Sequence, residues 1–337
     1  MKRPMLLPLA PLFRAAVAAK NLAYDKGWAT VLRLRGPVVS VGGLSVGGAG
    51  KTPLVIRLAQ LLQGEGVRVD VLSRGYGRSN TSTQRVDPTG TANDFGDEPV
   101  LIARRTNVPV FVGASRFQAG VLAEQAGDAI GAPALHLLDD GFQHRRLARD
   151  IDIVLVGQRD LDDYLLPAGN LREPLSALRR ASVLVLRDEE SHVAAHLRTR
   201  GLTQPLWFIT RQLEVPVVTG RSLAFCAIAR PDDFFAGVRE RVEAHQGNLV
   251  ATLAFPDHHA YSIADIERLV RAAKECGANV FLTTEKDEVK LPGELRSALE
   301  RVAPVRACRL SIVLQDEQES IRTMIRQLAI APNSPIV

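Results

Sequence analysis

Residues 37–63 read PVVSVGGLSVGGAGKTPLVIRLAQLLQ, and this stretch decides the fold. The apolar run at its start is typical of a buried strand, and the apolar spacing at its end is typical of a helix. Between them, residues 45–52 follow the phosphate-binding pattern G-x-x-x-x-G-K-[ST], with Ser45 in place of the first glycine. The stretch predicts a strand at 37–41, a phosphate-binding loop, and a helix at 52–63.

The loop supplies the groups that a bound ATP requires. Backbone N–H groups at the start of a helix can surround phosphate oxygens. The Lys51 ammonium is expected on the β- and γ-phosphates, and the Thr52 hydroxyl on Mg²⁺. Pro53 excludes the rival dinucleotide-binding pattern, whose last glycine would fall there. The expected ATP-binding residues are Ser45, Val46, Gly47, Gly48, Ala49, Gly50, Lys51 and Thr52.

A pair of acids is placed to complete a magnesium site. Asp139 and Asp140 directly follow the apolar run 134–138. Adjacent carboxylates repel each other, so the pair is a poor choice for stability alone. A bound cation would explain why two acids stand together. An ordinary surface turn is the alternative. We expect Asp139 to hold Mg²⁺ together with Thr52, with Asp140 in support.

The rest of the chain alternates short β-rich runs with helical stretches, which predicts a parallel α/β sheet. Further strands are expected at 67–72, 108–112, 134–138, 151–156 and 183–186, with a loop at 79–96. A proline-bearing shift in composition at 205–222 predicts a junction. Beyond it, strands are expected at 223–228, 250–255 and 280–283, with a helix at 263–276. The expected domains are an N-terminal helix (1–35), the P-loop NTPase-type core (36–215) and a smaller α/β C-terminal lobe (216–337).

The positive charge is concentrated at the N-terminus. Residues 1–35 contain seven basic side chains and one acid, so the surplus of +5 lies entirely within them. A nucleic-acid enzyme carries its basic residues around its working groove, so we expect no nucleic-acid partner. The three cysteines show no metal-binding spacing, which indicates reduced thiols in the cytosol and argues against zinc.

The N-terminal segment is also apolar on one helical face, which includes Leu9, Leu12, Phe13, Ala16 and Val17. A basic amphipathic helix of this kind can lie in the headgroup region of an anionic membrane. A cleaved signal peptide and a helix packed on its own domain are the alternatives. No apolar run in the sequence approaches the ~20 residues that a transmembrane helix needs, so we expect no membrane-spanning helix.

Phosphoryl transfer is favoured over switching. A guanine-nucleotide switch requires D-x-x-G, but Phe142 is the fourth residue counted from Asp139. It also requires [NT]-K-x-D, but residues 284–287 read TEKD. A kinase then needs a base near the acceptor hydroxyl.

Several side chains are candidates for the transfer site. Asp97 lies just after the 79–96 loop, and the pair His258-His259 could support such a base. Arg172 and Glu173 offer a guanidinium and a carboxylate. Each also has a structural interpretation: a helix-start acid, a surface histidine pair, and a loop ion pair, respectively.

Taken together, these motifs resemble the tetraacyldisaccharide 4′-kinase family, which phosphorylates the lipid A disaccharide 1-phosphate. The resemblance runs nearly end to end and shares the variant loop with Ser45. Its other motifs are NLAYDKG (21–27), SRGYGR (73–78), GDEP (96–99), DDGFQH (139–144), PAG with LREP (167–174), ARP (229–231), FPDHH (255–259) and TEKD (284–287).

The resemblance implies Mg·ATP as donor, an acylated disaccharide lipid as acceptor, and peripheral attachment to the cytoplasmic face of the inner membrane. It implies that Asp97 takes the acceptor proton with help from His258, and His259 is the alternative. Arg172 and Glu173 would lie near the phosphates. No obligate protein partner is evident. The alternative function is a membrane-associated P-loop ATPase that acts as a switch or partner-binding module.

Overall fold

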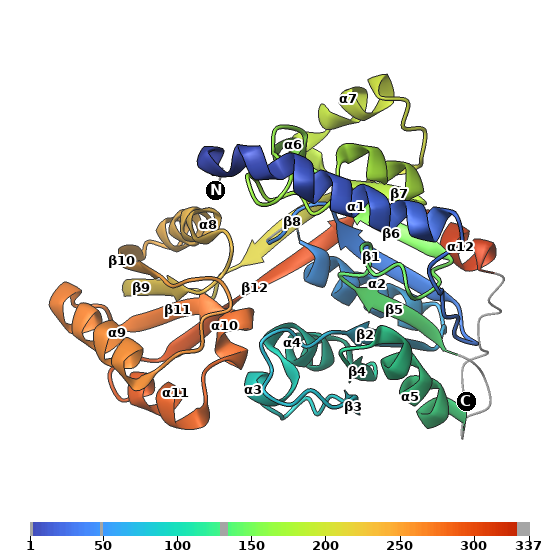
Figure 1. Cartoon of the computed structure of the whole chain (residues 1–337). Coiled ribbons are helices and arrows are strands. Elements are labelled where there is room, and N and C mark those ends of the chain that lie inside the picture. Colours follow the sequence, from blue (N-terminus) through green and yellow to red (C-terminus); the bar gives the residue numbers. More distant parts are fainter. Residues whose placement is uncertain (1–2, 48–49, 129–133, 329–337) are drawn as a thin grey trace.

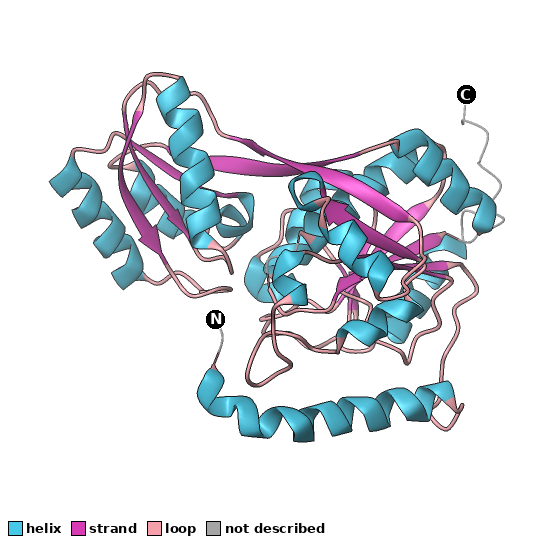
Figure 2. Cartoon of the chain, turned by 90° about the horizontal axis from the view of Figure 1, so that it is seen from above, coloured by secondary structure: helices cyan, strands magenta, loops and turns pink. Residues whose placement is uncertain are grey.

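The computed structural model describes residues 3–47, 50–128 and 134–328. Its strands join in one sheet of order β10-β9-β11-β12-β8-β7-β6-β1-β5-β2-β4-β3 (Figures 1 and 2). The strands are β1 Val38–Gly43, β2 Val69–Ser73, β3 Gln84–Arg85, β4 Val110–Val112, β5 Leu135–Asp139, β6 Ile151–Leu155, β7 Val183–Arg187, β8 Leu206–Glu214, β9 Arg221–Cys226, β10 Asn248–Ala254, β11 Val280–Thr284 and β12 Val305–Leu314.

Helices cover the sheet and lead into it. They are η1 Pro4–Leu9, α1 Ala10–Asp25, α2 Lys51–Gly64, α3 Ala92–Phe95, α4 Asp97–Thr106, α5 Arg116–Asp128, α6 Gln158–Leu161, η2 Leu175–Arg180, η3 Asp188–Glu190, α7 Val193–Thr199, α8 Pro231–Ala244, α9 Ile263–Cys276, α10 Glu285–Val289, α11 Gly293–Glu300 and α12 Glu317–Gln327. The predicted α/β class is confirmed.

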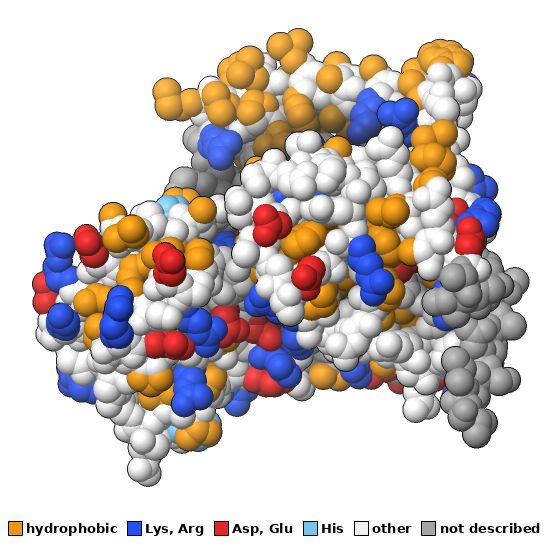
Figure 3. Space-filling view, turned by 90° about the horizontal axis from the view of Figure 1, so that it is seen from below, with side chains coloured by type: hydrophobic (Ala, Val, Ile, Leu, Met, Phe, Trp, Pro, Cys, Tyr) orange, Lys and Arg blue, Asp and Glu red, His pale blue; other side chains and the backbone are white. Residues whose placement is uncertain are grey.

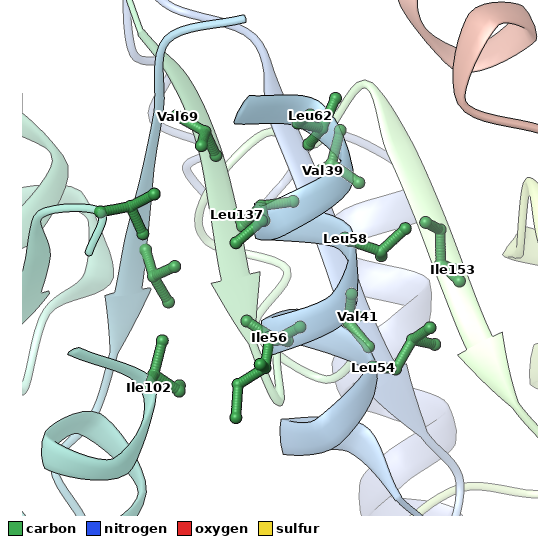
Figure 4. Packing of buried hydrophobic residues seen from close by; sticks show 14 of the residues in the cluster. Val39, Val41, Leu54, Ile56, Leu58, Leu62, Val69, Ile102, Leu137 and Ile153 are labelled. Atoms are coloured by element: carbon green, nitrogen blue, oxygen red, sulfur yellow. The ribbon is translucent and has the colours of Figure 1, made fainter. Parts of the chain in front are cut away.

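The core packs around the strand–loop–helix unit predicted from residues 37–63. Strands β7, β6, β1, β5, β2 and β4 are parallel neighbours, and β1, β2, β5 and β6 are buried along their whole length. Helix α2 lays Leu54, Leu58 and Leu62 against Val41 and its neighbours on the sheet (Figure 4). Their i, i+4 spacing places these leucines on one face of the helix, so the pattern that predicts α2 also buries it.

A second lobe forms around β9, β10 and β11, with helices α8, α9 and α11 (Figure 1). Its apolar side chains, including Phe225 and Phe281, form clusters separate from the core. The long strands β8 and β12 connect the lobes as an antiparallel pair, with Glu214 opposite Arg309 and Ile209 opposite Leu314. The region 205–222, whose composition predicts a domain junction, therefore contains strand β8.

The last described helix returns to the core. Ile321, Met324 and Ile325 of α12 are buried in the same cluster as α2. Glu317 of α12 also forms an ion pair with Arg57 of α2. The expected assignment of all of 216–337 to the C-terminal lobe is therefore wrong at its end, because α12 packs against the core.

Helix α1 runs along the outside of the molecule (Figure 2). None of its side chains is fully buried, and Leu12 is 70% exposed. Hydrophobic side chains line the edge that it forms, at the top of Figure 3. Met5–Asp25 forms 21 helical residues that are long and apolar enough to cross a membrane, by length and composition alone. This corrects the prediction of no span, which rested on the absence of an apolar run of ~20 residues.

Candidate active site

The 45–52 loop leaves the end of β1 and enters α2 at Lys51. Gly50 has a φ of +94°, a conformation that glycine adopts without strain. Ser45 is nearly buried, and its side chain hydrogen-bonds to Asp160. This contact gives a reason for serine in place of the usual glycine. Gly48 and Ala49, also predicted to bind phosphate, lie outside the described residues.

A neighbouring segment fixes the first half of the loop. The Val46 N–H donates to the Asn170 carbonyl at 2.9 Å, and Ser45 forms an isolated β-bridge with Leu171. The next residue, Arg172, donates to the Leu44 carbonyl through its backbone at 2.7 Å. The segment that carries Arg172 is thus hydrogen-bonded to the candidate phosphate loop on both sides of Ser45.

Asp140 gathers two cations beside this loop. Arg172 donates to both of its carboxylate oxygens at 2.7 Å, and the Lys51 Nζ lies 3.6 Å from its Oδ1. Burial would raise the pKa of Asp140, but Arg172 and Lys51 lower it. Asp140 was expected to support the magnesium site. Its oxygens are engaged by Arg172 here, so its visible role is to position cations.

Asp139 has the properties of a cation ligand. It is 2% exposed, and its Oδ1 has no hydrogen-bond partner. Burial, with the charges of Glu98 and Asp140, raises the pKa of Asp139 to about 8, although Lys51 and Arg116 oppose the shift. A buried carboxylate oxygen without a partner is costly unless a cation meets it.

The surroundings of Asp139 fit magnesium. Among the residues that the structure describes, no three His, Cys, Asp or Glu side chains gather to hold a metal by themselves. Mg²⁺ needs no such cage, because it is commonly held by one or two carboxylates together with substrate phosphates. Thr52 lies in the first turn of α2 with its side chain half-buried. Asp139 and Thr52 are therefore a chemically suitable pair.

Asp97 meets side chains from the second lobe. It is 4% exposed at the start of α4, and its Oδ2 lies 3.0 Å from His258 Nδ1 and 3.6 Å from Lys286 Nζ. Burial would raise the pKa of Asp97, but the His258 hydrogen bond and the Lys286 charge lower it to about 2. Asp97 is therefore a carboxylate at neutral pH.

The contacts of His258 define its neutral tautomer. Lys286 Nζ lies 3.4 Å from His258 Nε2, and a lysine ammonium can only donate. The Nε2 atom therefore accepts, which leaves the proton on Nδ1 to be donated to Asp97. The hydrogen bond to Asp97 raises the pKa of His258 against burial and the Lys286 charge. His258 also has a φ of 59°, which is uncommon outside glycine.

The sequence left open which histidine serves Asp97, and the contacts separate the two. His259 Nε2 lies 2.9 Å from Asp265 Oδ2, and its ring stacks on Phe255. His259 therefore belongs to the packing of the second lobe, and His258 is the histidine at Asp97.

In the described part of the chain, the Glu173 carboxylate forms no hydrogen bond with residues of the 45–52 loop. It is buried, and it accepts hydrogen bonds from Arg180 at 2.9 Å and from Asn21 of α1 at 2.8 Å. The neighbouring Arg172 shares Asp140 with Lys51, and its expected position near the phosphates stays a prediction. Glu173 instead fastens the N-terminal helix to the core.

Two cations at the site were not predicted. The sequence places Lys286 in a failed switch motif and in the family motif TEKD without a role, although Glu98, Asp97 and Asp257 surround it and raise its pKa against burial. Arg116 is 7% exposed at the start of α5, and its Nε has no hydrogen-bond partner. A lone arginine after a short strand gives no sequence signal. The TEKD motif did give one for Lys286.

Known proteins are similar to this chain over nearly its whole length. The sequence model of the family described as tetraacyldisaccharide-1-P 4'-kinase matches residues 2–329. A tetraacyldisaccharide 4'-kinase of Koribacter versatilis is 46% identical over 330 residues, covering 95% of this chain and 97% of the relative. One from Anaeromyxobacter sp. strain K is 37% identical over 365 residues, covering 99% and 94%.

A solved structure is similar to this one over nearly the whole chain. The crystal structure of the "apo" form of LpxK from Aquifex aeolicus in complex with ATP matches with a TM-score of 0.73 at 33% identity, covering 96% of this chain and 98% of that one.

The chain belongs to the tetraacyldisaccharide-1-P 4′-kinase family. It is accordingly an ATP-dependent kinase of lipid A biosynthesis, and the resemblance drawn from its motifs is confirmed. Membership of the tetraacyldisaccharide-1-P 4′-kinase family implies a lipid A precursor as substrate and association with a membrane.

Proposed function

We propose that this kinase transfers the γ-phosphate of ATP to the 4′-hydroxyl of tetraacyldisaccharide 1-phosphate between the Lys51 loop and the Asp97–His258 pair. The observation that carries the proposal is the contact of His258 and Lys286, from the second lobe, with Asp97 of the core. Asp97 is the ionised acceptor in this group, so it can bind the hydroxyl of the incoming sugar.

Asp97 acts mainly by orienting that hydroxyl. A carboxylate with a pKa of about 2 is a weak base. Phosphoryl transfer passes through a loose transition state, so the hydroxyl needs little activation before the new bond forms. Its oxygen bonds to the γ-phosphorus while the bond to the β,γ-bridging oxygen breaks. The proton passes to the Asp97–His258 pair, and ADP leaves.

Positive charge on the donor side comes from Lys51 and Arg172. Both are held by Asp140 beside the candidate phosphate loop. Preorganised charges of this kind account for much of the rate in phosphoryl transfer. Asp139 and Thr52 would hold Mg²⁺, which supplies charge neutralisation on the phosphate oxygens when bound.

We also place the reaction at the cytoplasmic face of the inner membrane, with α1 lying on or in the lipid surface. The exposed Leu12 and Met5, at 70% and 93%, lie on a segment that carries the basic surplus of the chain. Such a segment suits an anionic phospholipid surface.

The test is transfer from radiolabelled ATP to the lipid in micelles. The expected result is Mg²⁺-dependent label in the lipid product, abolished by Lys51→Ala. The alternative, a membrane-associated ATPase switch, predicts release of labelled inorganic phosphate that is indifferent to the lipid. Full activity of Lys51→Ala would discard the role given to the loop.

A further inference from the structure

A buried carboxylate joins the loops at one edge of the second lobe. It belongs to Asp287 of α10, which is fully buried and directly follows Lys286 in the chain. Strands β10, β9 and β11 are parallel to one another, so the segments that follow their carboxyl ends leave the same edge of the sheet. The Asp287 carboxylate contacts all three of these segments.

Four donors surround the two oxygens of this carboxylate. Its Oδ1 accepts hydrogen bonds from the Ala227 N–H and the Tyr261 hydroxyl, each at 3.1 Å, and lies 2.7 Å from the Lys290 Nζ. Its Oδ2 accepts a hydrogen bond from the Thr284 hydroxyl at 2.6 Å. The Lys290 ammonium also donates to the Ala227 carbonyl at 3.0 Å, so both polar groups of Ala227 are held.

Two of these contacts lie close in sequence to the partners of Asp97. Tyr261 comes three residues after His258, and Asp287 comes directly after Lys286. His258 has a φ of 59°, a conformation that persists outside glycine only where the surrounding contacts impose it. The hydrogen bond from Tyr261 to Asp287 is one such contact, because it ties the loop of His258 to the helix of Lys286.

The third contact leads to the candidate phosphate loop. Ala227 is two residues before Ala229, and a Cβ built on Gly47 would lie only 3.1 Å from the Ala229 Cβ. The segment after β9 therefore passes directly against the 45–52 loop. Asp287 and Lys290 fix the start of this segment through the N–H and the carbonyl of Ala227.

Stability alone does not explain a charge at this place. A buried ion pair stabilises a fold little more than well-packed apolar side chains of the same size. Hydrogen bonds to a carboxylate are directional and stronger than those between neutral groups, so they fix the loops relative to one another. Burial and the Asp287 charge raise the pKa of Tyr261, so its hydroxyl keeps the proton that it donates.

We propose that Asp287 is a positioning residue for phosphoryl transfer. Its carboxylate holds the loops of the second lobe in one arrangement, in which His258 and Lys286 both reach Asp97. The inference rests on the proposed function. Asp287 is buried and contacts neither Asp97 nor the 45–52 loop through any hydrogen bond of the described residues, so it acts through the side chains that it positions.

The test removes one donor from the carboxylate. Asp287→Ala would leave the buried Lys290 ammonium without its partner, a change that can prevent folding. Tyr261→Phe is gentler, because it keeps the ring that packs edge-on against Phe225 and Phe255. Tyr261→Phe is expected to lower kcat for lipid phosphorylation about tenfold, the scale of one hydrogen bond to a charged group. The KM for ATP should not change, because the 45–52 loop is built on the core.

Thr283→Val is the matched control. Thr283 is as buried as Asp287, and its hydroxyl donates to the Phe225 carbonyl at 2.9 Å within the same lobe. Both variants should lose stability in urea titrations, and only Tyr261→Phe should lose rate. In His258→Ala, the same change at Tyr261 should lower kcat by a smaller factor than in the wild type, since part of what it positions is gone.

NMR of the His258 ring nitrogens, assigned by comparison with His258→Ala, gives a readout that does not need turnover. Tyr261→Phe should weaken the hydrogen bond from His258 Nδ1 to Asp97, and Thr283→Val should not. The proposal is overturned if this signal is unchanged in Tyr261→Phe, or if the two variants have the same kcat. If the wild type does not phosphorylate the lipid, the proposed function fails, and the His258 signal still decides whether Asp287 positions the ring.

Discussion

Replacing His258 with alanine is expected to slow transfer by a calculable amount. The shift in the pKa of Asp97 from 3.8 to about 2 corresponds to roughly 2.5 kcal/mol in favour of the ionised form. The His258 hydrogen bond is the largest favourable contribution to that shift. A hydrogen bond to a charged group contributes roughly 1.5–3 kcal/mol, so its loss should lower kcat about 10- to 100-fold.

Asp97→Asn should cost more, about 10²- to 10⁴-fold, because it removes the group that meets the hydroxyl. The double variant should be no slower than Asp97→Asn, since the histidine acts through the carboxylate. The pH profile gives a further check. Loss of the bond raises the pKa of Asp97, so the acid limb of the rate of His258→Ala should move to higher pH.

The assay is label transfer to micellar lipid at saturating ATP, with initial rates from pH 4 to 9. His259→Ala is the matched control, because its ring pairs with Asp265 and stacks on Phe255. Its kcat should stay within about threefold of the wild type. A rate for His258→Ala that equals the control would refute the reasoning, as would a double variant whose loss is the product of the single losses.

Three further outcomes are expected. Lys51→Ala should lower kcat/KM for ATP by more than about 100-fold in the same assay, since the ammonium meets the charge that develops on the phosphates. Leu9→Ser with Leu12→Ser should lower recovery on anionic vesicles at least tenfold in sedimentation, because burying each leucine contributes about 1.5–3 kcal/mol. Glu317→Gln should lower the free energy of unfolding at pH 7 by up to about 1 kcal/mol in urea titrations, through loss of the pair with Arg57.

The pH dependence of the last variant follows from the pKa of Glu317, which Arg57 lowers despite burial. A carboxylate with a lowered folded pKa stabilises above its unfolded value near 4.5 and loses that stabilisation as pH falls through the folded value. Wild type and Glu317→Gln should therefore converge in acid. A difference in the free energy of unfolding that persists at pH 3 would contradict this prediction. An equal loss of stability in Glu319→Gln would contradict it as well. Retained ATP turnover in Lys51→Ala would contradict the predicted role of its ammonium group. Unchanged sedimentation of the Leu9→Ser, Leu12→Ser variant with vesicles would contradict the predicted role of these leucines in membrane binding.

The sequence predicts what local patterns determine. The run at 37–63 has one strong interpretation, because a buried strand, a glycine loop and an i, i+4 leucine helix agree with one another. Strands β8 and β12 were missed, since β8 alternates apolar residues with Thr210, Arg211 and Gln212 in a region that also contains prolines. Helix α12 was missed for another reason: only its packing on α2, far away in sequence, fixes its place.

The residues of the candidate site also divide into those that a local pattern predicts and those that depend on distant contacts. Asp139 and Lys51 could be named because each follows a strand or begins a helix in a recognisable pattern. Glu173 was assigned to the phosphates with its neighbour Arg172, yet successive residues of an extended segment point to opposite sides. That alternation sends Arg172 to Asp140 and Glu173 to Asn21. The place of Arg116 depends on the meeting of distant segments, which no local pattern reports. For Lys286 the TEKD motif gives a signal, but its contact with Asp97 also depends on such a meeting.

The antiparallel pair β8 and β12 connects the core, which carries Asp97, to the second lobe, which carries His258 and Lys286. The group proposed to orient the hydroxyl therefore takes its members from both lobes. Any change in the position of one lobe relative to the other would separate Asp97 from both partners at once.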